Sequence, residues 1–516
     1  MKTKFSFLLI LISFFAFSQV EEKKLDELIQ NTLKTFDVPG ISVGIVKDGK
    51  VIYSKGFGVR SLNTNQKMTD ETLVGIASNS KGFTATALAI LADEGKLNFD
   101  DKVSKYIPEF QMNDPYVSQN ITIKDLITHR AGLGLGQGDL MFFPEGGNLT
   151  VNEIIHNVRY LKPENPFRTT LDYNNIMFIV AGEVIHRVSG LSWADFIEQK
   201  ILKPVGMTSS FGSYNRAKAA NVQNIIEAHA PVNGKAIAVP HDWNETANAA
   251  GGIISNIKDM TTWAEFLMNG FTTKDGKKLV SDKQIQQLWN LQISTPVALK
   301  NAYDTNFGGY GLGWFVTDVK GHKQVYHTGG LIGTVTQFTL IPDMKLGIVV
   351  LTNQQSGAAF STITNTIKDS YLGMPEKDWL KTYGDRMAKI NADYEKGKKE
   401  VFAKSENFKK DRNCQIKNDQ ITGTYNDPWF GDVMITSEGK NLRLVSKNSP
   451  RLKGELLPYS PNVMIVKWDD RSYDADAFVN FALDENGKAI AIKLKPISDV
   501  TDFSFDFEDL DLQRKK

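Results

Sequence analysis

Apolar and polar residues alternate in a way that predicts strands at both ends of the first two thirds of the chain and helices between them. Residues 41–47 and 51–55 are short apolar runs on either side of Asp48-Gly49, which favours a β-hairpin. Residues 83–92 are almost entirely apolar and are followed by Gly95, as in a buried helix. Strand patterns return at residues 324–328, 334–341 and 346–352. We therefore expect an α/β (α+β) fold, with one antiparallel sheet flanked by helices beside an all-helical lobe.

The pattern changes after about residue 372. Residues 376–412 are charged and helical in pattern without a wide apolar face, which is typical of a linker or docking helix. Short strand patterns separated by turns then follow, at residues 423–425, 432–436, 441–445, 463–468, 478–483 and 489–494. These patterns predict a main domain at residues 19–372, a charged helical linker at 373–415 and a small β-barrel or sandwich domain at 416–516.

The first residues have the pattern of an export signal. Lys2 and Lys4 precede an apolar run at residues 5–17, and small residues allow cleavage after Ser18. The run is shorter than a membrane span requires, and no later stretch approaches eighteen apolar residues. We expect a signal peptide at residues 1–18, a periplasmic or secreted protein, and no membrane span in the mature chain.

Composition excludes several classes of protein. Among 516 residues the net charge is +1, without the basic surplus that a nucleic-acid partner requires. Cys414 is the only cysteine, so an internal disulfide framework and thiol catalysis are both unsupported. The seven histidines contain no His-Glu-x-x-His pattern, and neither a metal site nor a cofactor is expected.

One of three Ser-x-x-Lys matches stands out by its context. Ser78 and Lys81 open the apolar helix pattern, whereas Ser255 is predicted to cap an amphipathic helix and Ser437 to lie in a hairpin turn. A desolvated amine beside a serine is a known means of making the hydroxyl attack a carbonyl. The alternative is that Ser78 only caps the helix and Lys81 is solvated.

Two further patterns follow in the chain. Tyr173-Asn174-Asn175 is the only Tyr-x-Asn, and His327-Thr328-Gly329 is the only His-x-Gly. This order resembles the penicillin-recognising serine hydrolases, in particular their class C β-lactamase-like branch. The resemblance covers residues 25–370 and includes the segments 121–133, 204–208, 250–255 and 310–314. The C-terminal segment resembles the β-barrel accessory domain of some relatives, for which stability, a lid over the cleft or ligand binding are all open roles.

The resemblance implies roles for the first three residues. Ser78 would be the acylated nucleophile, and Lys81 its proton acceptor or the charge that tunes it. Tyr173 would be the general base, held at or near the phenolate state, and would then protonate the leaving group. Asn175 would hold the lysine and the substrate amide. Tyr173 and Asn175 could otherwise be a capping pair before an apolar helix that begins near Ile176.

The remaining implied residues lie on a strand at the edge of the cleft. His327 and Gly329 would border the substrate, and the backbone amides of Ser78 and Gly330 would form an oxyanion hole. Classical β-lactamases and transpeptidases have a lysine where this chain has His327, and an imidazole is mostly neutral at neutral pH. Many relatives have a hydroxyl residue where this chain has Gly330.

These features favour one activity over two others. We expect an exported serine hydrolase that forms an acyl-enzyme with an ester or a small peptide or amide, as in esterases and D-amino acid peptidases. The alternatives are a penicillin-interactive β-lactamase or D-Ala-D-Ala carboxypeptidase, and a non-catalytic binding or sensor protein on the same scaffold. The expected partner is a small-molecule or peptide substrate, and the sequence carries no signal for an oligomeric state.

Overall fold

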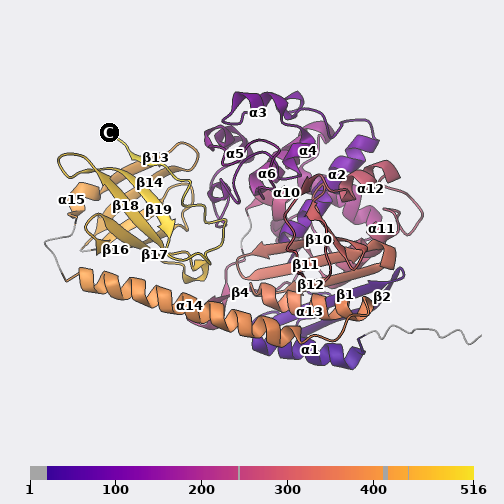
Figure 1. Cartoon of the computed structure of the whole chain (residues 1–516). Helices are drawn as coiled ribbons and strands as arrows, with labels where there is room; N and C mark the ends of the chain where they lie inside the picture. The colour runs from indigo at the N-terminus through magenta and orange to yellow at the C-terminus, as the bar shows by residue number, and fades with distance from the viewer. Residues whose placement is uncertain (1–19, 242–243, 411–415, 440) are drawn as a thin grey trace, which may run out of the picture.

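The computed structural model describes residues 20–241, 244–410, 416–439 and 441–516. It has a mixed α/β part and a closed β-barrel, joined by one long helix (Figure 1). The expected signal peptide, Cys414 and Lys440 lie outside the described residues.

The α/β part is built on one antiparallel sheet, as the sequence predicts, and this sheet has eight strands. Its strand order is β2-β1-β12-β11-β10-β9-β8-β7. The strands are β1 (Gly40–Lys47), β2 (Lys50–Gly58), β7 (Ile293–Ser294), β8 (Gly308–Tyr310), β9 (Phe315–Val319), β10 (His322–Leu331), β11 (Thr334–Ile341) and β12 (Leu346–Thr352). Strand β1 pairs with both β2 and β12, so the N-terminal hairpin and the strands near residue 350 form a single sheet.

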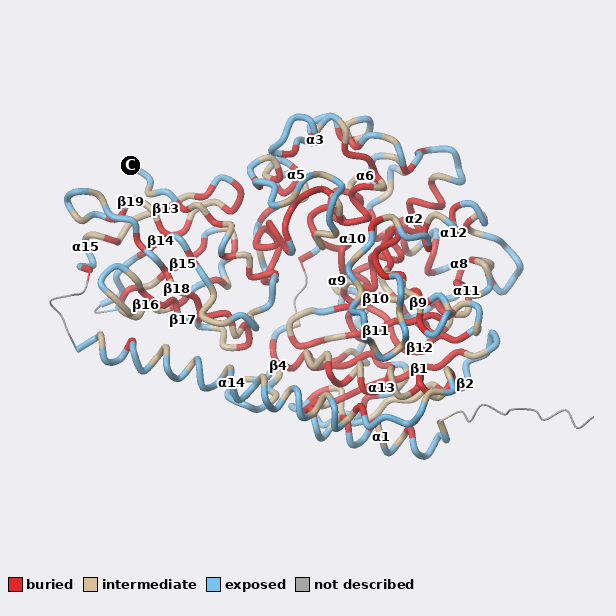
Figure 2. Tube along the Cα trace, in the orientation of Figure 1, coloured by how far each residue is buried: buried red, intermediate tan, exposed pale blue. Residues whose placement is uncertain are grey.

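Helices cover both faces of this sheet. Helices α1 (Glu22–Thr35) and α13 (Gly357–Tyr371) pack on one face, where Leu25, Val43 and Ile363 belong to a shared apolar cluster. Helix α11 (Ile257–Met268) packs on the other face, close to the backbone of β1. Figure 2 shows the buried segments gathered between these layers.

The helical lobe lies beside this second face and is centred on two buried helices. Helix α2 (Ser80–Asp93) is buried along nearly its whole length and packs against α6 (Asn175–Ser189) and α10 (Asn248–Gly251). The ring of Phe83 stacks on that of Trp263 at 4.0 Å between centroids. The lobe also contains α3 (Pro115–Asn120), α4 (Ile123–Leu126), α5 (Val151–Asn157), α7 (Trp193–Ile197), α8 (Lys203–Val205), α9 (Tyr214–Ala219) and α12 (Asp282–Trp289). Two short strand pairs complete the α/β part: β3 (Val74–Gly75) with β6 (Ile254–Ser255), and β4 (Ala228–Val232) with β5 (Lys235–Val239).

Within the described ranges, no single helix is long and apolar enough to cross a membrane. One pair of helices, α6 and the helical segment Trp193–Val205, is long and apolar enough for a membrane span only when the two are taken together, and the pair is bent by 72°.

The predicted charged helix and β domain are both present. Helix α14 (Trp379–Phe408) runs from the α/β part to the barrel, where Ser405 Oγ donates a hydrogen bond to the carbonyl of Pro458 at 2.8 Å. A short helix, α15 (Asn418–Ile421), precedes the barrel. The barrel strands are β13 (Gly423–Asp427), β14 (Gly431–Glu438), β15 (Asn441–Ser446), β16 (Lys453–Ser460), β17 (Val463–Trp468), β18 (Ala477–Leu483), β19 (Ala489–Pro496) and β20 (Leu512–Arg514). Because β13 pairs with both β14 and β20, the sheet closes on itself.

Two local predictions were wrong. Asn256, rather than Ser255, caps α11, because its side chain accepts a hydrogen bond from the backbone N–H of Asp259. Ser255 is buried in β6, and Ser437 lies in β14 rather than in the turn that follows it. Neither serine therefore resembles Ser78 in its surroundings.

Candidate active site

Ser78 lies on a short turn that connects β3 to α2. Residues Ala77–Asn79 form a 3-10 turn, so Ser78 precedes the α-helix instead of occupying its first turn. Ala77 has a φ of 49°, in the left-handed region that a residue with a Cβ adopts at a cost. The Asn79 side chain ties the turn down, donating to the carbonyl of Ile76 at 3.2 Å and to Thr336 Oγ1 at 2.8 Å. The turn thus holds the Ser78 hydroxyl at the edge of the cleft.

Lys81 is fully buried beside Ser78, so the interpretation of Lys81 as a solvated side chain is wrong. Its Nζ donates to three acceptors: Ser78 Oγ at 2.9 Å, Asn175 Oδ1 at 2.7 Å and the carbonyl of Ala250 at 2.9 Å. Burial lowers the pKa of Lys81 to about 7, although the nearby charge of Asp139 opposes this shift. Lys81 is therefore able to exchange a proton near neutral pH.

Tyr173 and Asn175 are not the capping pair that the sequence left open. Asn174 caps α6, since its side chain accepts a hydrogen bond from the backbone N–H of Met177 at 3.3 Å. This leaves the side chain of Asn175, the first residue of α6, free to reach Lys81. Its Nδ2 donates to Asp139 Oδ2 at 2.7 Å. Asn175 thus joins the amine to a buried carboxyl group.

Tyr173 faces the amine from the other side. Lys81 Nζ lies 4.9 Å from the centroid of the Tyr173 ring. Burial raises the pKa of Tyr173 above its usual value, and a hydrogen bond with Ser78 offsets part of that rise. The raised pKa favours the neutral phenol of Tyr173 in the free protein over the state at or near the phenolate that the resemblance implies.

The His129 ring packs against the Tyr173 ring. The two rings lie 4.2 Å apart between centroids, and His129 Nδ1 accepts a hydrogen bond from the backbone N–H of Asn174 at 3.0 Å. Burial lowers the pKa of His129 well below its usual value, so the ring is neutral. The sequence does not single out His129, although it lies within the segment 121–133 that carries part of the resemblance.

Asp139 is the main site residue that the sequence did not reveal. It is fully buried, and its Oδ2 accepts hydrogen bonds from Asn175 Nδ2 and from Ser504 Oγ, the latter at 2.8 Å. Burial raises the pKa of Asp139 to about 7, while the hydrogen bonds from Ser504 and Asn175 and the charge of Lys81 lower it. Asp139 follows a glycine-rich loop without helical or strand periodicity, so no local signal marks it.

His327 is a neutral, fixed side chain in β10. Its Nδ1 lies 2.6 Å from the carbonyl of Thr328, which requires a proton on Nδ1, and its Nε2 then accepts from Tyr310 Oη at 2.9 Å. Burial, with the charge of Lys81, lowers the pKa of His327 to about 3. The neutral imidazole expected from the sequence is thus maintained by its surroundings.

Gly329 and Gly330 bring β10 beside the serine turn. A Cβ on Gly329 would lie 2.4 Å from the carbonyl oxygen of Ile76, so only glycine allows this approach. A Cβ on Gly330 would meet nothing within 4 Å, and Gly330 lines the cleft with Ser78. One opening is therefore lined by Ser78, Tyr173, Asn175, His327 and Gly330. Lys81 contacts Ser78, and Gly329 contacts the serine turn.

That opening is a cavity of about 340 Å³. Its described lining contains Ser78, Leu135, Phe142, Phe143, Tyr173, Asn175, Ala250, Gly251, Phe315, His327, Thr328, Gly330, Leu331, Asp502, Phe503 and Ser504. The last three residues come from the loop between β19 and β20, so the barrel supplies part of the wall. The sequence did not predict this contribution.

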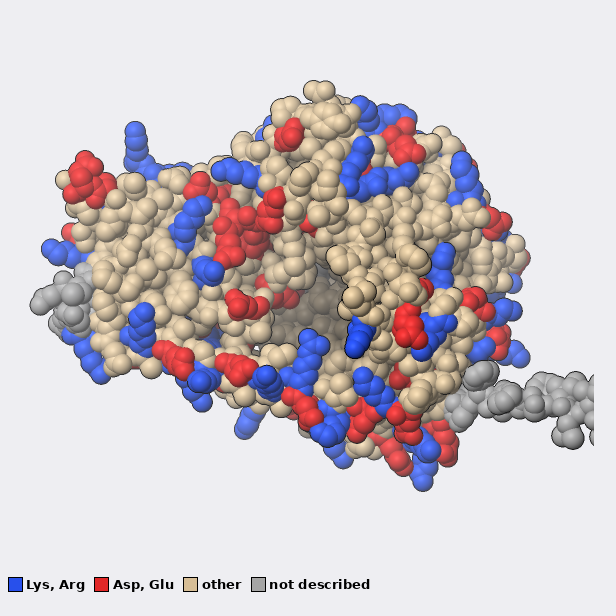
Figure 3. All heavy atoms as spheres, in the orientation of Figure 1, with Lys and Arg blue, Asp and Glu red and all other residues tan. Residues whose placement is uncertain are grey.

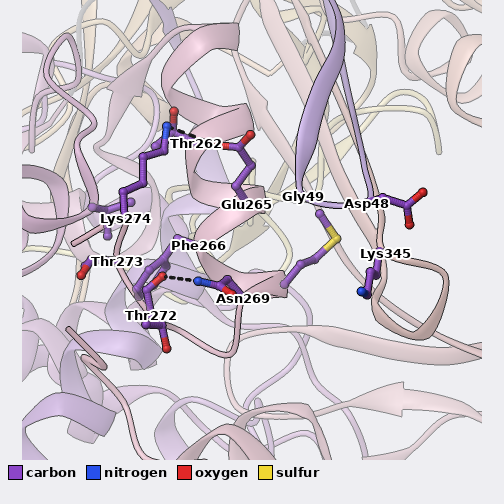
Figure 4. Close-up of a pocket in the computed structure, with 12 residues that line it drawn as sticks. Asp48, Gly49, Thr262, Glu265, Phe266, Asn269, Thr272, Thr273, Lys274 and Lys345 are labelled. Atoms are coloured by element: carbon purple, nitrogen blue, oxygen red, sulfur yellow. Dashed lines mark hydrogen bonds and ion pairs between the residues drawn. The ribbon is translucent and has the colours of Figure 1, made fainter. Parts of the chain in front are cut away.

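A separate hollow lies between α11 and the tip of the β1–β2 hairpin (Figure 4). Lys274 pairs there with Glu265 at 3.4 Å, and Asn269 Nδ2 donates to the carbonyl of Thr272 at 3.1 Å. None of the predicted site residues is among the described residues that line it. Among the described residues there is also no group of three or more His, Cys, Asp or Glu side chains arranged to hold a metal ion.

Comparison with known proteins identifies the larger part of the chain. The model of the Beta-lactamase family matches residues 25–371. The chain belongs to the Beta-lactamase family. Members of this family are serine hydrolases, and the penicillin-binding and class C β-lactamase likeness expected from the sequence is confirmed. Residues 417–514 match a domain of unknown function, DUF3471.

This Beta-lactamase family member is similar to two curated proteins from different organisms. The chain is 30% identical over 378 residues to "Unguisins hydrolase ungD'" of Aspergillus campestris, an alignment that covers 70% of this chain and 67% of the relative. It is 29% identical over 343 residues to "Protein flp" of Staphylococcus aureus, covering 65% of this chain and 64% of the relative. The chain thus spans about two thirds of the length of these relatives.

Two solved structures share the fold. An octameric penicillin-binding protein homologue from Pyrococcus abyssi aligns with a TM-score of 0.61 and 23% identity, covering 96% of this chain and all of the other. A class C beta-lactamase aligns with a TM-score of 0.55 and 22% identity, covering 69% of this chain and 96% of the other.

Proposed function

We propose that this Beta-lactamase family member is an exported serine hydrolase that forms an acyl-enzyme with an ester or a small peptide or amide. The hydrogen bonding of Lys81 carries the proposal. Membership of the family supports it, as does the name of the relative called a hydrolase. The pattern of residues 1–18 supports export. If the signal peptide is cleaved after Ser18, protein recovered outside the cytoplasm begins at Gln19.

Lys81 is arranged to act as a base when its amine is neutral. A neutral amine has two hydrogens and one lone pair, and Asn175 Oδ1 and the carbonyl of Ala250 accept its two hydrogens. The lone pair is then left for the third neighbour, Ser78 Oγ at 2.9 Å. Because the pKa of Lys81 is about 7, a large share of the protein has this form at neutral pH.

The reaction follows from this arrangement. Ser78 Oγ attacks the carbonyl carbon as its proton moves to Lys81 Nζ, and the backbone N–H groups of Ser78 and Gly330 stabilise the oxyanion, at about 3 kcal/mol for each donor. Tyr173 gives its phenolic proton to the leaving group and regains one from Lys81. Water then attacks the acyl-enzyme by the same proton path in reverse and releases the acid.

A penicillin-interactive enzyme is the second candidate, favoured by the fold shared with a class C beta-lactamase. Substrates of that kind carry a carboxylate, which calls for a cation at the cleft. The described lining contains neither lysine nor arginine, and His327 is neutral. We therefore place ester and amide hydrolysis first.

Labelling of the mature protein with a fluorophosphonate probe tests the hydrolase proposal. We expect covalent labelling that Ser78→Ala abolishes. Ser437→Ala is the matched control, since Ser437 belongs to another Ser-x-x-Lys match and lies exposed on the barrel. The absence of any labelling that depends on Ser78 would favour the non-catalytic alternative. Assays with nitrocefin and a p-nitrophenyl ester then rank the two enzymatic candidates, and faster turnover of nitrocefin would reverse our order.

A further inference from the structure

A loop of the barrel is fixed against the cleft by aromatic contacts. The loop, residues 501–509, follows β19 and turns back towards the α/β part. The edge of the Phe503 ring approaches Tyr173, at 6.2 Å between centroids, and the Phe505 ring meets Phe143 at 4.9 Å. These contacts hold the loop against the cleft, which Ser78 and residues 502–504 line together.

Asp502 gives this cleft its charge. It is the single carboxylate among the described residues that line the cleft, and that lining includes no lysine or arginine. Asp502 is an exposed residue that lines the cleft, and within the described part of the chain it takes part in no ion pair. Partial desolvation by the surrounding protein raises the pKa of the Asp502 carboxyl, and the hydrogen bonds from Ser504 offset part of that rise.

We propose that Asp502 binds a positively charged amino group of the substrate. The hydrolase would then act on acyl compounds that carry a free amine, such as aminoacyl amides and small peptides with a free amino terminus. This inference rests on the proposed function and narrows its substrate class.

The surroundings of Asp502 favour a cation over an anion. A neighbouring hollow shares Leu135, Asp502 and Phe503 with the cleft and is lined by further carboxylates, those of Glu164, Asp499, Asp506, Glu508 and Asp509, against one cation, Lys495. Figure 3 shows Asp and Glu side chains gathered where the barrel faces the α/β part. Such a field attracts cationic ligands and repels carboxylates.

A purely structural role for Asp502 makes a different prediction. Its Oδ1 accepts a hydrogen bond from the backbone N–H of Ser504 at 2.9 Å, which shapes the loop. An asparagine keeps this acceptor and removes only the charge. Asp502→Asn therefore separates the structural role from the binding role without removing the turn.

The test compares alanine p-nitroanilide, as each enantiomer, with its N-acetyl derivative at pH 7.5, where the anilide still carries a substantial ammonium fraction. We expect kcat/KM to favour the free amine by about tenfold or more. Asp502→Asn should remove that preference mainly through KM. Asp499→Asn is the matched control, since Asp499 has the same charge but lies outside the cleft.

A binding measurement tests the inference even for compounds that the enzyme hydrolyses slowly. Alaninamide should protect Ser78 from the fluorophosphonate at lower concentration than N-acetylalaninamide does, and Asp502→Asn should equalise the two. Equal protection in the unmodified protein, or an equal effect of Asp502→Asn on both compounds, would overturn the inference while leaving the proposed function in place. Loss of Ser78-dependent labelling altogether would overturn both.

Discussion

Ser504 of the barrel donates a hydrogen bond to Asp139 of the α/β part at 2.8 Å. Asp139 in turn accepts from Asn175, which accepts from Lys81, which contacts Ser78. A continuous chain of hydrogen bonds therefore runs from the barrel to the proposed nucleophile. The barrel is in a position to affect proton transfer as well as the shape of the cleft.

Ser504→Ala should alter the pH dependence of the reaction. The Ser504 hydrogen bond lowers the pKa of Asp139, so its loss makes Asp139 less ionised near neutral pH. A less ionised Asp139 stabilises the Lys81 ammonium less, and the pKa of Lys81 falls. We expect the acid limb of kcat/KM to move to lower pH, and stability to fall by about 1 kcal/mol. A change in stability without movement of the limb would mean that Ser504 only holds the domains together.

Asp139→Asn should move the same limb further in the same direction. The substitution removes the negative charge that raises the pKa of Lys81, and it keeps a side chain of nearly the same shape. Asp259→Asn is a suitable control, because Asp259 is also buried and hydrogen-bonded, to Ser210, yet lies outside this network. Adding Ser504→Ala to Asp139→Asn should produce no further shift, since the carboxylate through which Ser504 acts is gone.

The unmodified protein should be inactive at low pH and gain activity through an apparent pKa of about 7. The reason is that only the neutral amine of Lys81 can accept the Ser78 proton, and protonation below that pKa removes it. Because Lys81 and Asp139 titrate in the same range, the limb belongs to the pair. The measurement is kcat/KM against pH, which reports the free enzyme. A flat profile between about pH 5 and 8 would contradict Lys81 as the base.

Local patterns predicted most of the fold. The N-terminal hairpin, α2, β10–β12, α14 and six barrel strands all have periodicity or turn residues that can be read directly. Strand β16 was missed because Gly454 and Pro458 interrupt its pattern, and a register shift follows Pro458. Strand β20 has only three residues, too few to show alternation.

The site was predictable only where its residues carry a motif. Ser78 and Lys81 lie one helical turn apart in the sequence, and Tyr173 and Asn175 belong to a unique pattern. Asp139 has no such neighbour, since its partners are Asn175 and Ser504, which lie 36 and 365 positions away. Contacts between distant residues depend on how the barrel docks, and no local pattern specifies that.

Gly329→Ala should impair activity more than stability. The added Cβ would lie 2.4 Å from the carbonyl oxygen of Ile76 and 2.6 Å from Thr336 Oγ1, so β10 must move away from the turn that carries Ser78. Misplacement of reacting groups by about 1 Å can cost about 100-fold in rate, whereas overpacking costs about 1–3 kcal/mol of stability. Gly357→Ala is the control, because its Cβ would meet only the Phe360 ring, at 3.5 Å. Kinetics and thermal unfolding of both variants decide the matter: a Gly329→Ala protein with unchanged kcat/KM would show that the close approach of β10 to the serine turn is dispensable.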